Sequence, residues 1–114
     1  MTNICDRIRR VLRDLGANHT DRGFRYTLIA VKLVWETEDN LHPVRKKVYD
    51  VIAKREHCHP KAVESAIREI SRKAWKFDQA FFLNYEASLL AAPSNVKLLE
   101  ILLRHLHDTT ERER

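Results

Sequence analysis

Two helix-forming segments joined by a short break occupy residues 48–75, and they constrain the fold more than any other feature. This stretch reads VYDVIAKREHCHPKAVESAIREISRKAW. Apolar residues recur every three to four positions on both sides of the break at residues 56–59, which predicts two amphipathic helices. Ala53 is small and lies late in the first helix, and Val63 opens the apolar face of the second. This pairing is typical of a helix-turn-helix, whose two helices cross closely.

The second helix, expected over about residues 60–75, has an apolar face and a polar face. At about 100° per residue, its apolar residues cluster on one side. The other side carries Lys61, Glu64, Ser65, Arg68 and Arg72. A recognition helix in the major groove of DNA has this pattern. Any amphipathic surface helix has it too, so the pattern leaves both interpretations open.

Positive charge is concentrated on the same part of the chain. The net charge is +5, and residues 42–76 alone carry 10 basic and 4 acidic side chains. Residues 1–41 are nearly balanced, and residues 77–114 carry more acidic than basic side chains. A localised basic field is expected of a protein that binds a polyanion. A solvated, lysine-rich surface is the alternative.

The remaining segments predict an all-α domain of six helices over residues 1–107. The chain has 114 residues, enough for one core, and only 2 Gly and 3 Pro, which favours helices over a turn-rich β fold. Thr2 or Asn3 caps a first helix that ends before Gly16. Further helices are expected at about 24–36, 43–55, 78–85 and 94–106. Pro43 suits the first position of the third helix. The helix-turn-helix is expected over about residues 43–75. Residues 108–114 are expected to form a charged tail.

Two groups of apolar residues in the C-terminal part of the chain are expected to be buried. We interpret Phe77, Phe81, Phe82 and Tyr85 as core residues and not as a base-stacking platform. The last helix is more apolar than a single buried stripe requires, with apolar residues Val96, Leu98, Leu99, Ile101, Leu102, Leu103 and Leu106. It is therefore buried on two sides, either within the fold or against a second copy.

Other classes of chemistry are disfavoured. Cys5 and Cys58 have no disulfide-like or Cys-x-x-Cys spacing, so we expect free thiols in a reducing compartment. No apolar run approaches the roughly 20 residues that span a bilayer, and we expect a soluble, cytoplasmic protein. His57, Cys58 and His59 are adjacent, so they cannot easily all face one metal ion. We expect no metal, no other cofactor and no enzymatic activity.

The sequence resembles the C-terminal DNA-binding effector domain of the sporulation initiation response regulator. The resemblance covers about residues 4–106. It is densest at Tyr49, Ile52-Ala53-Lys54, Val63-Glu64, Ala66-Ile67-Arg68 and Ala74-Trp75, and it includes residues 30–34 and 93–95. It implies six helices with the fourth in the major groove of a short repeated promoter box. It also implies head-to-tail dimers on tandem sites, with the last helix at the contact, and an interaction with the sigma subunit of RNA polymerase.

The resemblance also suggests individual roles. Glu64 and Arg68 match residues on the base-reading face, where Arg can bind guanine and Glu can accept from cytosine. The full set of expected DNA contacts is Lys46, Lys54, His59, Lys61, Glu64, Ser65, Arg68 and Arg72. The expected dimer contacts are Leu99, Leu102, Leu103 and Leu106.

Some positions depart from the family pattern. The family has Arg at the position of Ser65 and threonines at the positions of Cys58 and His59. Residues 76–79 replace a segment that contains Gly and follows the family's Trp, so the family's sigma contact does not carry over directly to this chain. The family's phosphoacceptor receiver domain has no counterpart in these 114 residues, so the sequence represents either an excised domain or a relative without that switch. Two functions remain open: a sequence-specific transcription regulator associated with the bacterial nucleoid, or a helical interaction module that has lost base reading.

Overall fold

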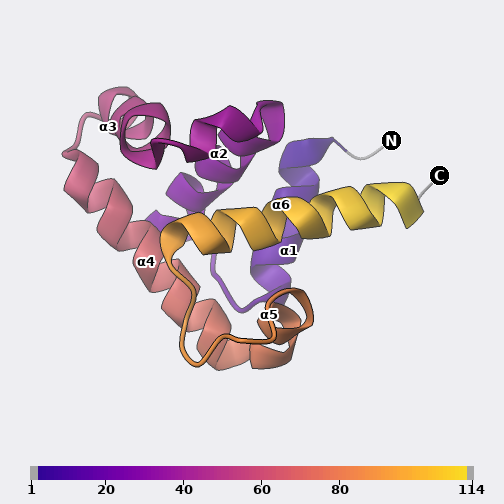
Figure 1. Cartoon of the computed structure of the whole chain (residues 1–114). Helices are drawn as coiled ribbons and strands as arrows, with labels where there is room; N and C mark the ends of the chain where they lie inside the picture. The colour runs from indigo at the N-terminus through magenta and orange to yellow at the C-terminus, as the bar shows by residue number, and fades with distance from the viewer. Residues whose placement is uncertain (1–2, 113–114) are drawn as a thin grey trace.

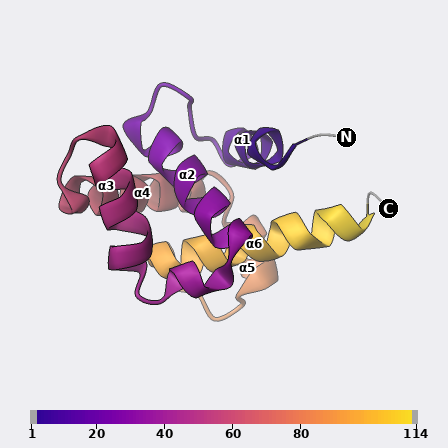
Figure 2. The same cartoon turned by 90° about the horizontal axis from the view of Figure 1, so that it is seen from above.

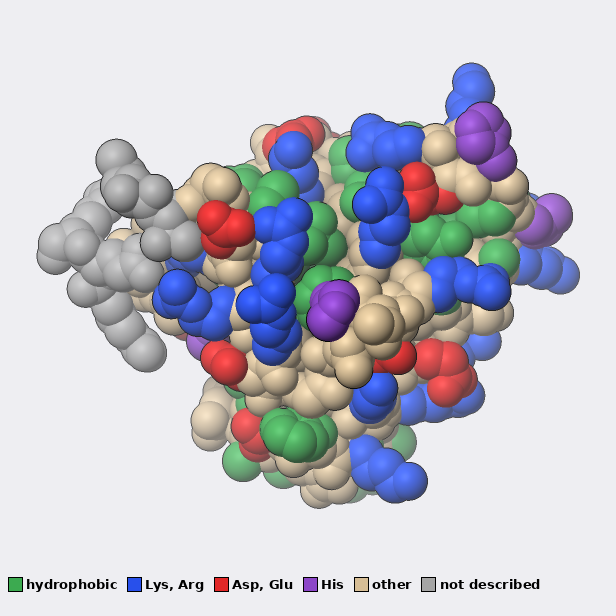
Figure 3. Space-filling view, turned by 180° about the vertical axis from the view of Figure 1, so that it is seen from behind, with side chains coloured by type: hydrophobic (Ala, Val, Ile, Leu, Met, Phe, Trp, Pro, Cys, Tyr) green, Lys and Arg blue, Asp and Glu red, His purple; other side chains and the backbone are tan. Residues whose placement is uncertain are grey.

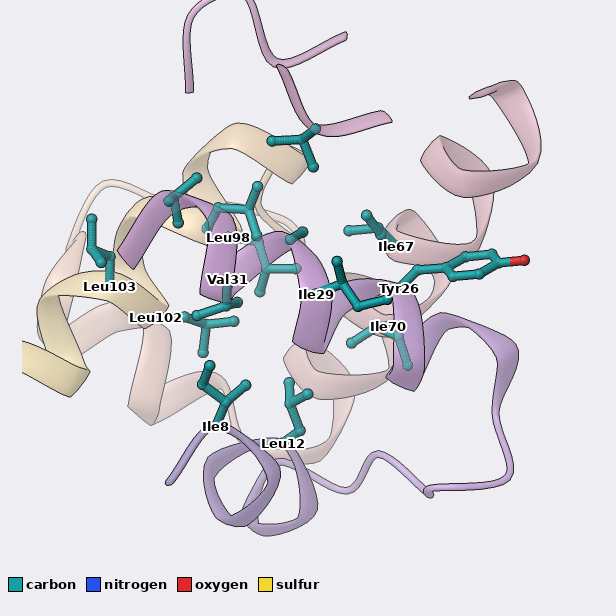
Figure 4. Close-up of a cluster of buried hydrophobic side chains, with 14 of the residues drawn as sticks. Ile8, Leu12, Tyr26, Ile29, Val31, Ile67, Ile70, Leu98, Leu102 and Leu103 are labelled. Atoms are coloured by element: carbon teal, nitrogen blue, oxygen red, sulfur yellow. The ribbon is translucent and has the colours of Figure 1, made fainter. Parts of the chain in front are cut away.

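Helix α2 (Arg22–Glu36) is the central element of the fold, and helices α1 (Ile4–Asp14), α4 (Pro60–Phe77) and α6 (Asn95–Arg112) pack against it (Figure 1). The computed structural model describes residues 3–112, and every regular element within that range is helical. Figure 4 shows side chains of these helices meeting in one cluster around α2. The expected all-α fold with six helices is confirmed.

Helix α1 begins and ends at the predicted residues. The Asn3 Oδ1 accepts a hydrogen bond from the backbone N–H of Asp6 at 2.9 Å, which caps the helix. Thr2, the other candidate cap, lies outside the described residues. Gly16 has a φ of +87°, a conformation that glycine adopts without strain. The helix therefore ends where the sequence predicts.

Helix α2 is buried more completely than a single stripe predicts. Of the expected stripe, Phe24 and Val31 are buried, whereas Leu28 and Trp35 are only partly covered. Ala30 and Val34 are also fully buried. The difference follows from the position of α2, because three other helices cover it on different sides.

The first helix of the predicted helix-turn-helix is not a uniform α-helix. A 3₁₀ turn, η1 (Glu38–Leu41), is followed by a π-helical turn, η2 (Arg45–Tyr49), which continues directly into α3 (Asp50–Glu56). Pro43 lies in the turn before η2 and not at the first helical position. Viewed from above, α3 lies beside the beginning of α4 (Figure 2).

The aromatic residues near α5 (Gln79–Tyr85) do not all belong to the core. Phe82 is fully buried, and Phe81 and Tyr85 are partly buried against the core. Phe77 is 65% exposed, so its assignment to the core was wrong. Its ring lies over Gly16, where an added Cβ would come within 2.8 Å of the Phe77 Cγ. One side of the Phe77 ring covers the backbone at Gly16, and the rest of the ring stays exposed to solvent.

Helix α6 continues through residues that the sequence assigns to a charged tail, as far as Arg112. Arg7 of α1 donates hydrogen bonds to the backbone oxygen of Leu106 at 2.6 Å and to the Thr109 hydroxyl at 2.7 Å. It also donates to the Thr110 hydroxyl at 2.5 Å. These bonds fasten the end of α6 to α1. The remaining predicted tail residues, 113–114, lie outside the described residues.

The apolar face of α6 is buried within the chain itself. Leu99, Leu102, Leu103 and Leu106 are 0–3% exposed and belong to the same core as Ile8 and Val31 (Figure 4). Of the two alternatives for this helix, burial inside the fold is therefore the one observed. These four side chains offer almost no surface to a second copy, so any dimer contact of α6 would use its exposed residues.

Candidate nucleic-acid interface

The turn between α3 and α4 is built around His57. This residue has φ 55° and ψ 49°, the left-handed conformation that usually requires Gly or Asn. The backbone N–H of Cys58 then donates to the Ala53 oxygen at 3.0 Å, a bond characteristic of a Schellman motif. His57 thus occupies the position of the motif that glycine usually takes.

His59 caps α4. Its Nδ1 accepts a hydrogen bond from the Lys61 backbone N–H at 3.1 Å, and Pro60 occupies the first position of α4. One ring nitrogen of this predicted DNA contact is therefore used within the chain. The side chain is nevertheless exposed.

The inner face of α4 matches the sequence prediction. Val63 and Ile67 are fully buried, and Ile70 and Ala74 are almost so. Backbone packing against α2 is closer than the apolar pattern indicates, because a Cβ added to Gly23 would lie 2.3 Å from the Ala66 oxygen. Sequence reasoning missed this contact. Its signal is a glycine in the first turn of a helix, where no cap requires one.

The outer face of α4 presents the predicted polar side chains to solvent. Lys61, Ser65, Arg68 and Arg72 are exposed, and Glu64 is half-buried. The Arg68 Nη2 lies 3.3 Å from the Glu64 Oε1, and Arg72 pairs with Glu69 at 2.9 Å. Both arginines are held along the helix by neighbouring carboxylates. Exposed pairs of this kind contribute little to stability, so they open at little cost.

Basic side chains from the preceding helix flank this face. Lys46 of η2 and Lys54 of α3, two of the expected DNA contacts, are exposed. Arg45, which is absent from the predicted contacts, lines a small hollow together with Tyr49, Lys61 and Glu64. Its signal in the sequence is the basic run at residues 45–47. Arg45 and Lys61 therefore place positive charge on both sides of the entry to α4.

Charged side chains are interspersed on the visible surface of the molecule in Figure 3, which shows it from behind. Lysine, arginine and histidine gather at the corner that carries α3 and the turn before α4. Acidic side chains lie among the basic ones elsewhere on that face. The positive charge of residues 42–76 is thus only partly at this corner, because Arg72, Lys73 and Lys76 lie toward the other end of α4 (Figure 1).

Ion pairs and hydrogen bonds hold the turn to α2. The Arg25 guanidinium donates hydrogen bonds to the Glu56 carboxylate at the end of α3, which lowers the pKa of that carboxyl. Cys58 lies 3.7 Å from the Tyr26 hydroxyl, and this contact raises the pKa of Tyr26. Together with the cap at His59, these contacts give Cys58 and His59 separate roles. Among the side chains that the structure describes, residues 3–110, no three His, Cys, Asp or Glu are arranged to hold a metal ion.

The N-terminus of α6 is attached to both helices of the helix-turn-helix. The Asn95 Nδ2 donates to the Tyr49 hydroxyl at 3.1 Å and to the Glu64 backbone oxygen at 2.9 Å. The Ser71 hydroxyl donates to the Pro93 oxygen at 2.7 Å. Burial raises the pKa of Tyr49, so its hydroxyl keeps its proton. Periodicity does not predict these contacts, because the partners lie 22–46 residues apart.

Comparison with known families agrees with this geometry. The model of a family described as the sporulation initiation factor Spo0A C terminal matches residues 8–106. The chain belongs to this family. A Spo0A C-terminal domain is a DNA-binding effector domain of a transcription factor, and the family is not one of enzymes. The match covers the helix-turn-helix and most of α6. No helix within the described part of the chain is both long and apolar enough to cross a membrane.

Proposed function

We propose that the chain is a sequence-specific transcription regulator that inserts α4 into the major groove of double-stranded DNA. The observation that carries this proposal is the strip of exposed polar side chains on α4, whose opposite face is buried in the fold. The residues of the strip are Lys61, Glu64, Ser65, Arg68 and Arg72. A helix held by its inner face is free to present its outer face to base edges.

Base reading falls to the middle of this strip. Arg68 can donate two hydrogen bonds to a guanine, and Glu64 can accept one from a cytosine amino group. Their mutual ion pair must open first, which costs about 0.3–0.5 kcal/mol for an exposed pair at this spacing. One bidentate base contact contributes about 1–3 kcal/mol of discrimination. This exceeds the cost of opening the ion pair, so replacing the pair by contacts with bases is favourable.

Ser65 sets this chain apart from the family pattern. It is exposed on the same side of α4, about 100° around the helix axis from Glu64 and about 60° from Arg68. A serine hydroxyl bonds either an acceptor or a donor, whereas the arginine that it replaces selects guanine. We therefore expect a target sequence that differs from the family's usual promoter box at one position.

Phosphate contacts supply the affinity that is independent of sequence. Lys46, Lys54, Lys61, Arg72 and His59 surround the reading face, and the N-terminus of α4 adds its own partial positive charge. Binding should therefore weaken steeply as salt rises, because each neutralised phosphate releases counterions. From this DNA binding we infer that the protein associates with the nucleoid in the bacterial cytoplasm.

Partner proteins follow from the family and from two exposed surfaces. Head-to-tail dimers on tandem sites would use exposed residues of α6 such as Arg104, since its leucines are buried. Contact with the sigma subunit of RNA polymerase would involve residues 76–79, at the end of α4 and the beginning of α5. Phe77 is the apolar side chain that this segment exposes most, at 65%.

Selection from a pool of random duplex DNA tests the function directly. The chain is incubated with the pool at moderate salt, and the bound duplexes are amplified and sequenced over several rounds. The proposal predicts an enriched motif. Lack of enrichment, combined with tight self-association in sedimentation experiments, would instead identify a helical interaction module that does not read bases.

A further inference from the structure

The segment at residues 93–95 forms hydrogen bonds with α4 at two points. Asn95 donates to the Glu64 backbone oxygen at 2.9 Å, and the Pro93 oxygen accepts from the Ser71 hydroxyl at 2.7 Å. Glu64 and Ser71 are seven residues apart, which is about two turns and about 10 Å along the helix axis. Two attachments at this spacing restrict the rotation of α4 about its axis as well as its tilt.

Asn95 also joins the two halves of the helix-turn-helix. The same Nδ2 donates to the Tyr49 hydroxyl at 3.1 Å, at the point where η2 continues into α3. One side chain thus contacts both η2 and α4. Inside α4, the Glu64 oxygen already accepts a helical bond, and a carbonyl oxygen has a second lone pair for Asn95. The Asn95 bond therefore adds orientation without being needed for the helix itself.

The burial of Asn95 indicates that this arrangement serves more than packing. The residue is 8% exposed, and its Oδ1 has no hydrogen-bond partner among the described residues. A buried unsatisfied acceptor is destabilising, and an apolar side chain would avoid that cost. What an apolar residue cannot supply is the Nδ2 that connects Tyr49 to Glu64.

We propose that Asn95 is a positioning residue for DNA reading, which sets the angle at which α4 presents Glu64 and Arg68 to base edges. It touches no DNA and acts through the backbone of α4. This inference rests on the proposed function, because it concerns the same reading face. It adds that specificity depends on a residue 31 positions away from Glu64 in the sequence.

The test compares Asn95→Ala with two other variants. Tyr49→Phe removes only the hydroxyl that accepts one Asn95 bond, and it remains available if Asn95→Ala does not fold. Ile8→Val shortens a buried side chain of α1, away from the helix-turn-helix, and controls for a general loss of stability. All proteins are measured well below their melting temperatures, with the duplex that the unmodified chain selects and with a scrambled duplex.

Asn95→Ala should lower the ratio of specific to nonspecific affinity by about tenfold, the scale of one misplaced base contact. Tyr49→Phe should lower the ratio by a smaller factor, and Ile8→Val should leave it unchanged. An unchanged ratio in both Asn95→Ala and Tyr49→Phe, or an equal fall in Ile8→Val, would overturn the proposal.

A second measurement needs no DNA. Residual dipolar couplings of backbone N–H groups report the orientation of α4 relative to α3. A reorientation in Asn95→Ala or Tyr49→Phe, and none in Ile8→Val, is the expected result. Unchanged couplings in both variants would refute the positioning role. Failure of the selection experiment would count against DNA reading instead, so the two failures are distinguishable.

Discussion

At the scale of single residues, a substitution of Arg68 distinguishes base recognition from nonspecific electrostatic attraction to DNA. Its guanidinium is exposed on α4 and pairs with Glu64 when no DNA is bound. Arg68→Ala should lower affinity for the selected duplex by about 1–3 kcal/mol, the contribution of a bidentate contact to guanine. Affinity for a scrambled duplex should fall much less. Competition binding at fixed salt measures both values.

Arg13→Ala is the matched control, because it removes the same charge from an exposed position on α1. This variant should weaken binding to both duplexes slightly and equally. If Arg68→Ala also lowers the two affinities by the same factor, Arg68 does not read bases.

Residues with local roles were predictable from the sequence, whereas residues with distant partners were not. Ala53 and Val63 fit the close crossing of two consecutive helices, and both are buried there. Gly23 and Asn95 act on α4 from other parts of the chain. Spacing along one helix contains no information about which remote residue will meet it.

At the scale of elements, the turn between α3 and α4 depends on an uncommon conformation of His57. A residue with a side chain pays about 1–2 kcal/mol in the left-handed region, and glycine avoids that strain. His57→Gly should stabilise the fold by about 0.5–1 kcal/mol, because greater freedom of the unfolded chain offsets part of the gain. Urea unfolding measures the difference.

Lys54→Gly provides the comparison, three residues earlier and inside α3. There the same replacement should destabilise by about 1 kcal/mol, because glycine is unfavourable in a helix interior. A destabilising His57→Gly would show that the imidazole makes contacts that matter more than the strain.

The Arg25–Glu56 pair connects α2 to the end of α3 and makes stability depend on pH. The pKa of Glu56 is lowered in the folded chain, so the pair stabilises above the ordinary carboxyl pKa. That contribution disappears as the pH falls through the lowered value. Glu56→Gln should therefore melt at a slightly lower temperature than the unmodified chain at neutral pH, and the two should converge in acid.

Thermal unfolding followed by circular dichroism from neutral to acidic pH gives both curves. Glu38→Gln, at an exposed carboxylate of η1, controls for the loss of one negative charge. A gap between Glu56→Gln and the unmodified chain that persists at low pH would mean that the ion pair is not its cause.

The ends of helices were predictable where a local capping residue sets them. The predictions were wrong where contacts with distant residues set the end of the helix. Asn3, Gly16 and Pro60 lie at the predicted helix ends. Residues 45–49 form a π-helical turn. The spacing of apolar residues in this segment predicts an ordinary α-helix and gives no sign of the π turn. Helix α6 continues beyond residue 107, where Arg7 bonds Thr109 and Thr110 and supports the last turns.

At the scale of the whole molecule, the leucines of α6 stabilise the single chain. Leu102 is 1% exposed and lies in the cluster with Ile8 and Val31. Leu102→Ala should reduce the free energy of unfolding by about 2–5 kcal/mol, the usual cost of such a truncation in a core. The loss should be the same at low and high protein concentration. A loss that varies with concentration would reveal a dimer contact through this residue.

The central claim is that the exposed face of α4 contacts DNA bases, and an NMR footprint tests it most directly. Backbone amide shifts of the ¹⁵N-labelled chain are recorded with the selected duplex and with a scrambled duplex. The largest differences between the two should fall at residues 61–72, with phosphate-contacting residues such as Lys46 and Lys54 shifting similarly in both. Differences concentrated on α1 or α6, with α4 unchanged, would contradict the proposed mode of recognition.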